Sequence, residues 1–338
     1  MKQFITCLSL VAAIAAPVSI VSAQGPSGFH IAKTFHIASP GGWDYVSVNF
    51  TSNQLYVSHG AQVNILDKST GDSIGFVPNT AGVHGIAYNN AMGRGYTSNG
   101  RSNNVSVFDL KTQALLTQIT TGTNPDAIMY DEFSKKVITC NGRSNDLSVI
   151  DPSTDKVVAT IPVGGKPETA VSDNAGKIFV NIEDKNEIIA IDIKTNTVLG
   201  HWALTPGESP TGLAIDTKTK RLFAGCDKQL IVMDATNGNV VAKLPIGDGC
   251  DGVSFDPTLK LVFTSNGSGT MTVIKESSAS DFSVVENVPT KRGARTICVD
   301  EKTHRVYLLA ADYEAQAAGA TGRPRMIPGS FQVLMLEK

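Results

Sequence analysis

A unit of 40 to 44 residues recurs seven times along this chain of 338 residues. Each copy contains a short apolar run that alternates with period two, clearest at 63–67, 105–109, 147–151, 188–192 and 230–234 and weaker at 271–275 and 331–335. A period of this length indicates a solenoid, a propeller or an array. Because the runs have the periodicity of strands and not of helices, they favour the propeller.

Each unit contains four such runs, separated by polar turns. In the second copy they are 85–88, 95–98, 105–108 and 114–119. The fourth run appears only six times before the chain ends, and the segment 31–37 (IAKTFHI) supplies a seventh. We therefore expect an all-β, seven-bladed β-propeller with four antiparallel strands per blade. An N-terminal strand should complete the last blade and close the ring.

The first 23 residues have the pattern of a signal peptide. Lys2 precedes an apolar stretch at 5–16, and small residues at 21–23 precede Gln24. This pattern predicts an exported protein, periplasmic or secreted, with no transmembrane segment in the mature chain. Residues 24–338 should form one propeller and act as a monomer. We expect its blades near 41–82, 83–124, 125–166, 167–209, 210–249, 250–293, and 294–338 plus 29–40.

Charge and cysteine content narrow the classes of partner. Lys and Arg number 29 against 31 Asp and Glu, so the chain lacks the dense basic surface that duplex nucleic acid requires. No CxxC motif is present, which argues against a zinc ribbon or a thioredoxin-like site. Cys226 and Cys250 fall on one face of adjacent predicted blades, so a disulfide between them is geometrically allowed in an exported protein.

Several segments of the repeat are more specific for a protein family than the repeat length alone. They are Leu-Tyr-Val at 55–57, Asn-Gly-Arg-Ser-Asn at 99–103 and again at 141–145, and Val-Val-Ala-Thr-Ile-Pro-Val-Gly at 157–164. With these segments, residues 29–338 resemble the YVTN repeat of YncE-like seven-bladed propellers. The resemblance implies a secreted or periplasmic propeller. Some relatives are suggested to bind DNA or metal, and other seven-bladed propellers are lactonases or cyclases, so the fold alone selects no function.

One position recurs where each innermost strand should begin. Strand direction places these positions together, at the mouth of the central channel. The residues there are Asp44, His84, Asp126, Glu168, Thr211, Asp251 and Arg295. Six of the seven are ionisable, so we expect a charged ring.

Such a ring has three chemical interpretations. Carboxylates with an imidazole can bind a divalent metal: Ca²⁺ takes oxygen ligands, whereas Zn²⁺, Mn²⁺ or Fe²⁺ accepts histidine as well. Crowded carboxylates can instead raise one another's pKa and act as general acid and base, with Arg295 holding an anion. The third interpretation is a solvated polar rim around a water-filled channel.

Further candidates come from the loops between the second and third strands. His59 and His84 belong to neighbouring blades and can meet, so the candidate metal ligands are His59, His84, Asp44 and Asp126. Arg101 and Arg143 occupy equivalent turns, where they can bind a carboxylate or phosphate or simply face solvent. The corresponding loop of the last unit, 311–330, is far longer than the others and predicts a lid, a partner-binding segment or a disordered one.

The sequence therefore predicts an exported propeller that binds a small molecule, a metal ion or a cell-envelope protein at its charged channel mouth. The alternatives are a metal- or carboxylate-assisted lactonase, lyase or isomerase at the same place, and a scaffold in a cell-envelope complex. The chain contains no GxSxG, P-loop or dinucleotide motif. Apart from a divalent metal, the sequence indicates no cofactor.

Overall fold

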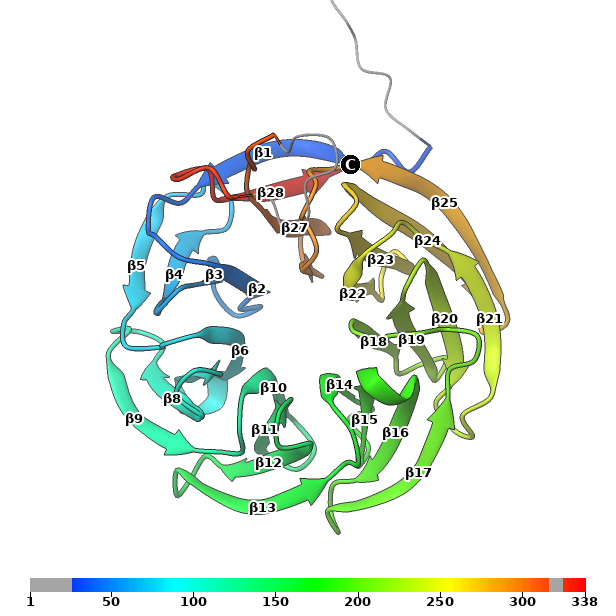
Figure 1. The fold of residues 1–338 in the computed structure, drawn as a ribbon, viewed down its shortest axis with the longest axis horizontal. Coiled ribbons are helices and arrows are strands. Elements are labelled where there is room, and N and C mark those ends of the chain that lie inside the picture. The colour runs from blue at the N-terminus through cyan, green and yellow to red at the C-terminus, as the bar shows by residue number, and fades with distance from the viewer. Residues whose placement is uncertain (1–25, 316–324) are drawn as a thin grey trace, which may run out of the picture.

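The computed structural model describes residues 26–315 and 325–338. Within this part of the chain the backbone forms seven four-stranded sheets around a central axis (Figure 1). Neighbouring strands in these sheets are antiparallel throughout the ring. The prediction of a seven-bladed β-propeller is confirmed. The predicted signal peptide, 1–23, lies outside the described residues.

The first four blades follow one another along the chain. Blade 1 contains β2 (Trp43–Val48), β3 (Gln54–His59), β4 (Gln62–Asp67) and β5 (Ser73–Val77). Blade 2 contains β6 (Val83–Asn89), β7 (Arg94–Asn99), β8 (Asn104–Asp109) and β9 (Leu115–Thr120). Blade 3 contains β10 (Pro125–Asp131), β11 (Lys136–Asn141), β12 (Asp146–Asp151) and β13 (Lys156–Pro162). Blade 4 contains β14 (Pro167–Ser172), β15 (Lys177–Ile182), β16 (Glu187–Asp192) and β17 (Thr197–Ala203).

The remaining blades complete the ring. Blade 5 contains β18 (Leu213–Asp216), β19 (Arg221–Cys226), β20 (Gln229–Asp234) and β21 (Val240–Pro245). Blade 6 contains β22 (Cys250–Asp256), β23 (Leu261–Asn266), β24 (Thr270–Ser278) and β25 (Asp281–Pro289). Blade 7 contains β26 (Ile297–Asp300), β27 (Arg305–Ala310), β28 (Gln332–Glu337) and β1 (His30–His36). The short 3-10 helices are η1 (Asn90–Met92) and η2 (Glu183–Lys185), and no helix of the described residues is long and apolar enough to cross a membrane.

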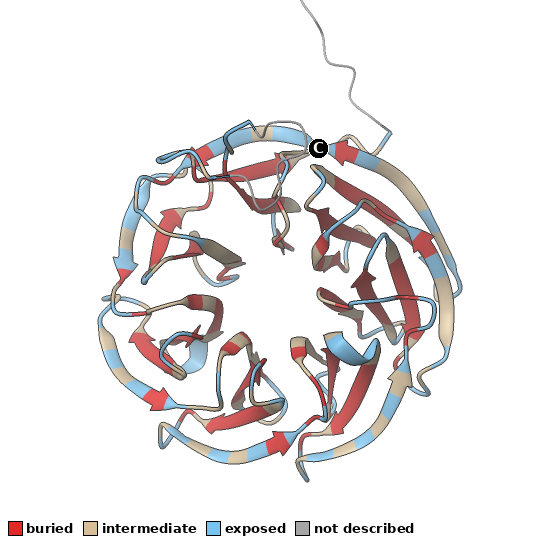
Figure 2. Ribbon diagram, viewed as in Figure 1, coloured by how far each residue is buried: buried red, intermediate tan, exposed pale blue. Residues whose placement is uncertain are grey.

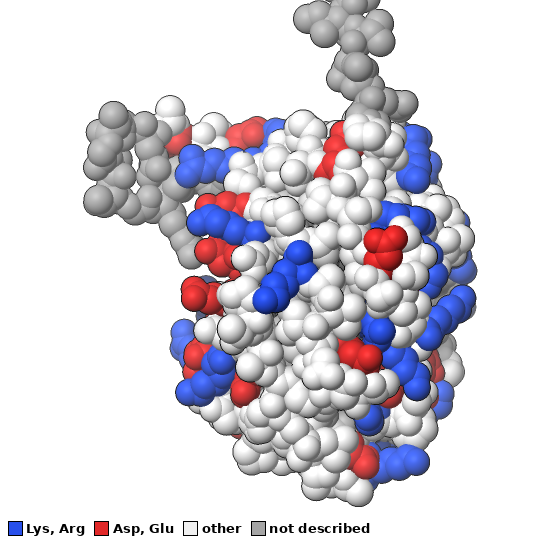
Figure 3. All heavy atoms as spheres, turned by 90° about the vertical axis from the view of Figure 1, so that its right-hand side faces the viewer, with Lys and Arg blue, Asp and Glu red and all other residues white. Residues whose placement is uncertain are grey.

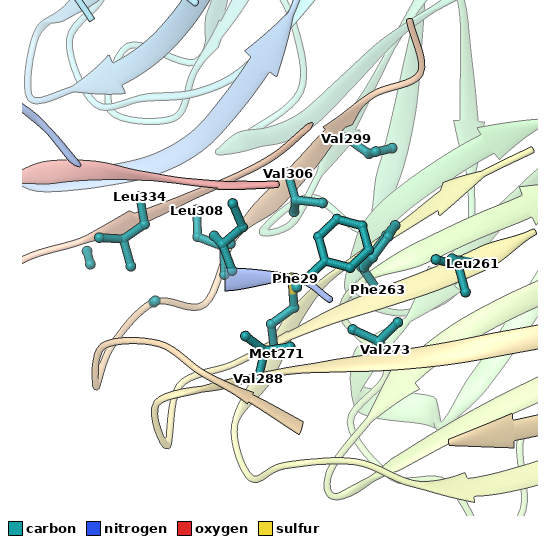
Figure 4. Packing of buried hydrophobic residues seen from close by; sticks show 13 residues of the cluster. Phe29, Leu261, Phe263, Met271, Val273, Val288, Val299, Val306, Leu308 and Leu334 are labelled. Atoms are coloured by element: carbon teal, nitrogen blue, oxygen red, sulfur yellow. The ribbon is translucent and has the colours of Figure 1, made fainter. Parts of the chain in front are cut away.

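Ring closure depends on β1. This strand pairs with β28 from His30 opposite Glu337 to His36 opposite Gln332, as the segment 31–37 predicted. Just before β1, the Phe29 ring packs edge-on against Phe263 of blade 6, with 5.1 Å between ring centroids (Figure 4). The N-terminal segment is therefore attached to both blade 6 and blade 7.

Burial explains why the middle strands of each blade are continuously apolar whereas the outermost strand alternates. The middle strands of a blade are covered on both faces by neighbouring blades, so they are continuously apolar; β16 is buried at all four of its central residues (Figure 2). The outermost strand faces solvent on one side, and β17 accordingly alternates between exposed and half-buried residues. The core lies between the blades and leaves the channel axis to polar groups.

One face of the propeller, opposite the starts of the innermost strands, contains the turns that follow the third strands; we call it the turn face. Aspartates recur in these turns. Asp67 accepts hydrogen bonds from the backbone N–H groups of Ser69 and Thr70, at 2.8 and 3.0 Å. Asp109, Asp151, Asp192 and Asp234 accept the equivalent bonds in their own turns. These aspartates cap their turns by accepting backbone hydrogen bonds from the residues that follow. In the side view, charged residues gather toward the two faces of the disk (Figure 3).

Candidate functional site at the channel mouth

The structure brings all seven predicted mouth residues to one cavity of roughly 320 Å³. The innermost strands β2, β6, β10, β14, β18, β22 and β26 surround the central axis (Figure 1). The seven mouth residues lie at or just before the starts of these strands. The lining of the cavity consists of Asp44, Tyr45, His84, Asp126, Lys166, Glu168, Glu183, Thr211, Asp251, Arg295 and Thr296. Each blade therefore contributes at least one polar side chain to a common space.

β-Bulges direct most of these side chains into the channel. In blade 1, Trp43 pairs with His59 and the next pair is Val46 with Val57, so Asp44 and Tyr45 together oppose Ser58. The Ser58 hydroxyl accepts both of their N–H groups, at 3.2 and 2.8 Å. The same register shift occurs at the starts of β6, β10, β14 and β22. A bulge turns its extra residue out of the sheet, which here places the recurrent position in the channel.

Hydrogen bonds between blades hold the mouth in place. The Ser98 hydroxyl of blade 2 donates to the Asp126 carbonyl of blade 3. Equivalent bonds run from Asn181 to the Thr211 carbonyl, from Thr211 to the Cys250 carbonyl, from Ser265 to the Arg295 carbonyl and from Thr296 to the Asp44 carbonyl. Because each bond fixes a backbone carbonyl at or next to a site residue, the ring is preorganised.

One side of the cavity is a carboxylate–imidazole–carboxylate cluster. His84 Nδ1 lies 2.5 Å from Asp44 Oδ2 and 3.8 Å from Asp126 Oδ1. One ligand atom from each residue lies within 4.8 Å of the others, close enough for the three residues to hold one metal ion together. Burial lowers the pKa of His84, but the hydrogen bond to Asp44 and the charge of Asp126 outweigh it and raise the pKa to about 9. The imidazole therefore carries a proton at neutral pH.

Beside this cluster, in blade 4, lies Lys166, which is not among the residues predicted from the sequence. Its Nζ lies 2.6 Å from Glu168 Oε1 and also contacts Glu183. Burial and the charge of Asp126 raise the pKa of Glu168 to about 8, although Lys166 opposes the shift. Lys166 precedes the recurrent position by two residues, so it does not appear in that column of the repeat.

The pKa values of two aspartates in the ring, Asp126 and Asp251, are raised as well. Burial and the charge of Asp44 raise the pKa of Asp126 to about 6. Burial likewise raises the pKa of Asp251 to about 6, against the effect of Arg295, whose Nε lies 3.3 Å away. Burial and the nearby carboxylates raise the pKa of the Tyr45 hydroxyl as well. The cavity thus concentrates negative charge that its own cations only partly offset.

The prediction that His59 joins His84 is wrong. His59 is buried; its Nδ1 lies 2.7 Å from the Ser39 hydroxyl, and its Nε2 lies 2.9 Å from the Gly41 carbonyl. Its ring packs on Phe331 with 4.2 Å between centroids. Burial lowers its pKa. Since both ring nitrogens have hydrogen-bond partners, His59 has a packing role.

The remaining predicted residues lie elsewhere. Arg101 and Arg143 are exposed in turns between the second and third strands of their blades, and neither is among the residues that line the mouth cavity. Cys226 and Cys250 are buried free thiols, so the predicted disulfide is absent. The Cys226 thiol lies 3.9 Å from the Ala224 carbonyl, and the Cys250 thiol lies 3.7 Å from the Gly252 carbonyl.

The long connection in blade 7 is described only at its base. Tyr313 and Met326 form an isolated antiparallel bridge, and the Glu314 N–H donates to the Arg325 carbonyl at 2.8 Å. The predicted lid or partner-binding segment falls largely on 316–324, outside the described residues. The described base nevertheless places Tyr313 beside the mouth, against Trp43.

Comparison with known proteins identifies the fold. No family model and no curated protein matches the sequence. Among solved structures, hydrazine synthase of Kuenenia stuttgartiensis matches with a TM-score of 0.71 and 18% identity, over 81% of this chain and 94% of that chain. The WD40 repeats of RRP9 match with a TM-score of 0.76 and 9% identity, over 94% of this chain and 99% of that chain. At these identities the similarity shows the propeller fold alone.

Proposed function

We propose that this protein is an exported propeller of the YVTN-repeat kind that binds a divalent metal ion at its channel mouth. The observation that carries the proposal is the convergence of Asp44, His84 and Asp126, whose ligand atoms lie within 4.8 Å of one another. One imidazole with two carboxylates suits Zn²⁺, Mn²⁺ or Fe²⁺ better than Ca²⁺, which prefers oxygen ligands.

The electrostatics of the cavity support the same proposal. Asp126 and Asp251 both have a raised pKa because they are buried among other carboxylates. A bound cation would offset this repulsion, and it would displace the proton from His84. Metal affinity should therefore increase as pH rises from 6 to 9, since His84 has a pKa of about 9.

Calorimetric titration of chelator-treated protein with Zn²⁺ and Mn²⁺ tests the proposal. We expect His84→Ala to weaken binding by about a hundredfold, since groups that merely orient metal ligands already contribute ten- to a hundredfold. Asp248→Ala is the matched control, because Asp248 is an exposed carboxylate that does not line the cavity. Absence of binding in the wild type, or equal binding by His84→Ala, would refute the metal site.

Acid–base catalysis at the same mouth is the second candidate function. Asp126 and Glu168 have pKa values of about 6 and 8, so near neutral pH one is mostly ionised while the other is mostly protonated. A carboxylate base, a carboxylic acid and the Arg295 cation would suit a lactonase, lyase or isomerase. Turnover of a lactone panel that disappears in Glu168→Gln, with metal binding retained, would establish this alternative. If the protein is instead a scaffold, that role would tolerate both His84→Ala and Glu168→Gln.

Location is a separate part of the proposal. The pattern of residues 1–23 supports export, to the periplasm or outside the cell. N-terminal sequencing of the protein recovered from its host should begin near Gln24. Recovery of the full chain from the cytosol would contradict export and leave the metal site unaffected.

A further inference from the structure

A second cavity, of roughly 440 Å³, adjoins the channel mouth between blades 6, 7 and 1. Its lining consists of Gly42, Trp43, Gly267, Arg292, Gly293, Arg295 and Tyr313. Only Arg295 also lines the mouth cavity. The volume lies within the usual range for small-molecule sites. Its lining differs from that of the mouth: it contains two arginines, two aromatic rings and no carboxylate.

Trp43 and Tyr313 form the aromatic wall of this cavity, and both pack against neighbouring residues. Trp43 stacks on Phe331 with 4.9 Å between centroids and 27° between planes. The Tyr313 ring lies 6.4 Å from the Trp43 ring, tilted by 45°. Gly293, at φ +83°, allows Tyr313 to lie so close that an added Cβ would be 3.0 Å from its ring. The cavity therefore presents an aromatic surface of the kind that flat rings pack against.

The cationic side of the cavity is only partly neutralised. Arg292 is exposed, and within 26–315 and 325–338 no acidic residue forms an ion pair with it. Its neighbour Lys291 instead pairs with Asp312, at 2.7 Å. Arg295 approaches Asp251 from Nε, at 3.3 Å. Guanidinium groups bind carboxylates through paired N–H donors, and here two of them line one cavity.

We propose that this cavity binds a small planar carboxylate. Its ring would pack against Trp43 and Tyr313, and its carboxylate would accept hydrogen bonds from Arg292 and Arg295. The site is separate from the metal cluster, because neither His84 nor Asp126 lines it. It does not depend on the proposed metal function.

Gly42 provides a way to close the cavity without disturbing the core. An added Cβ at this position meets no atom within 4 Å, and its backbone is outside the left-handed region. Gly42→Leu should therefore fold normally and fill the cavity, while Gly42→Ala leaves most of the space. Thermal unfolding of both variants checks that the propeller is intact.

The experiment titrates 2-naphthoate into the full chain by calorimetry, with 2-naphthol and acetate as probes that lack the carboxylate or the ring. We expect one site with a Kd of about 0.1 mM or lower, and binding at least tenfold weaker for either partial probe. Gly42→Leu should abolish binding and Gly42→Ala should retain it. Arg292→Gln should weaken it by about tenfold, the effect of losing a charge-assisted hydrogen bond.

His84→Ala separates this proposal from the metal site, since it should bind 2-naphthoate as the wild type does. No saturable binding up to about 1 mM, or wild-type affinity in folded Gly42→Leu, would overturn the carboxylate site. Equal affinity for naphthoate and naphthol would also overturn it. None of these results would bear on metal binding at His84.

Discussion

The two faces of the propeller place the same residue type in opposite environments. On the turn face, Asp151 accepts hydrogen bonds from the Ser153 hydroxyl and N–H at 2.7 and 2.9 Å, and its pKa falls to about 2. At the channel mouth, Asp126 is buried beside other carboxylates, and its pKa rises to about 6. Aspartates on the first face stabilise the fold, whereas burial among like charges makes those on the second costly in stability.

This contrast has opposite consequences for the pH dependence of stability. A carboxyl with a lowered folded pKa, such as Asp151, stabilises the fold above its unfolded pKa, and this contribution is lost as pH falls toward 2. A group with a raised folded pKa contributes its full stabilisation below its unfolded pKa and loses it as pH rises through its folded pKa. For Asp126, Glu168 and His84 that contribution is lost as pH rises through about 6, 8 and 9. We expect maximal stability of the metal-free protein at roughly pH 4 to 5.

The largest effect should come from the turn face. Lys68 Nζ pairs with Asp300 at 2.9 Å, and the side chains are only 8% and 0% exposed. Lys68→Met should therefore lower the free energy of unfolding by about 3 kcal/mol at pH 7, because it leaves a buried charge without its partner. Urea denaturation measures the loss. Lys68→Met with Asp300→Asn should recover much of it, and a double variant as unstable as the single one would show that the charge is not responsible.

At the mouth, neutralising an acid should have the opposite sign. Glu168→Gln removes a carboxyl with a pKa of about 8 from a buried, acidic environment. We expect it to reduce the decline in stability between pH 5 and 9 by roughly 2 kcal/mol. Denaturation curves across this range, with chelator present, test the expectation. A slope unchanged from the wild type would remove the distinction between the two faces.

The smallest effect should come from a single turn cap. Asp151→Ala removes two hydrogen bonds to Ser153 and an ion pair with Lys136 at 3.0 Å. We expect a loss of about 1 kcal/mol at pH 7 that shrinks as pH falls toward 2. Asp281→Ala, at an exposed position on β25, serves as the control. A loss that stays constant down to pH 2 would show that the Asp151 charge contributes nothing.

The repeat made the fold predictable from sequence. Seven alignable copies identified both the strands and the column that contains Asp44, His84 and Asp126, because each blade meets the same neighbours. Lys166 was not predicted, since it reaches Glu168 from outside that column. His59 was misassigned because the ring that covers it, Phe331, comes from the far end of the chain. In these cases the sequence predicted where the backbone lies but not where the side chains point.

The pairing of β1 with β28 also determines when the ring can close. During synthesis β1 has no partner strand until β28, Gln332–Glu337, has been made. A chain halted before Gln332 would leave the outer edge of β27 and the apolar face around Phe29 uncovered. Such a product would be a substrate for proteases and prone to aggregate, so the pairing of β1 with β28 distinguishes closed rings from open ones.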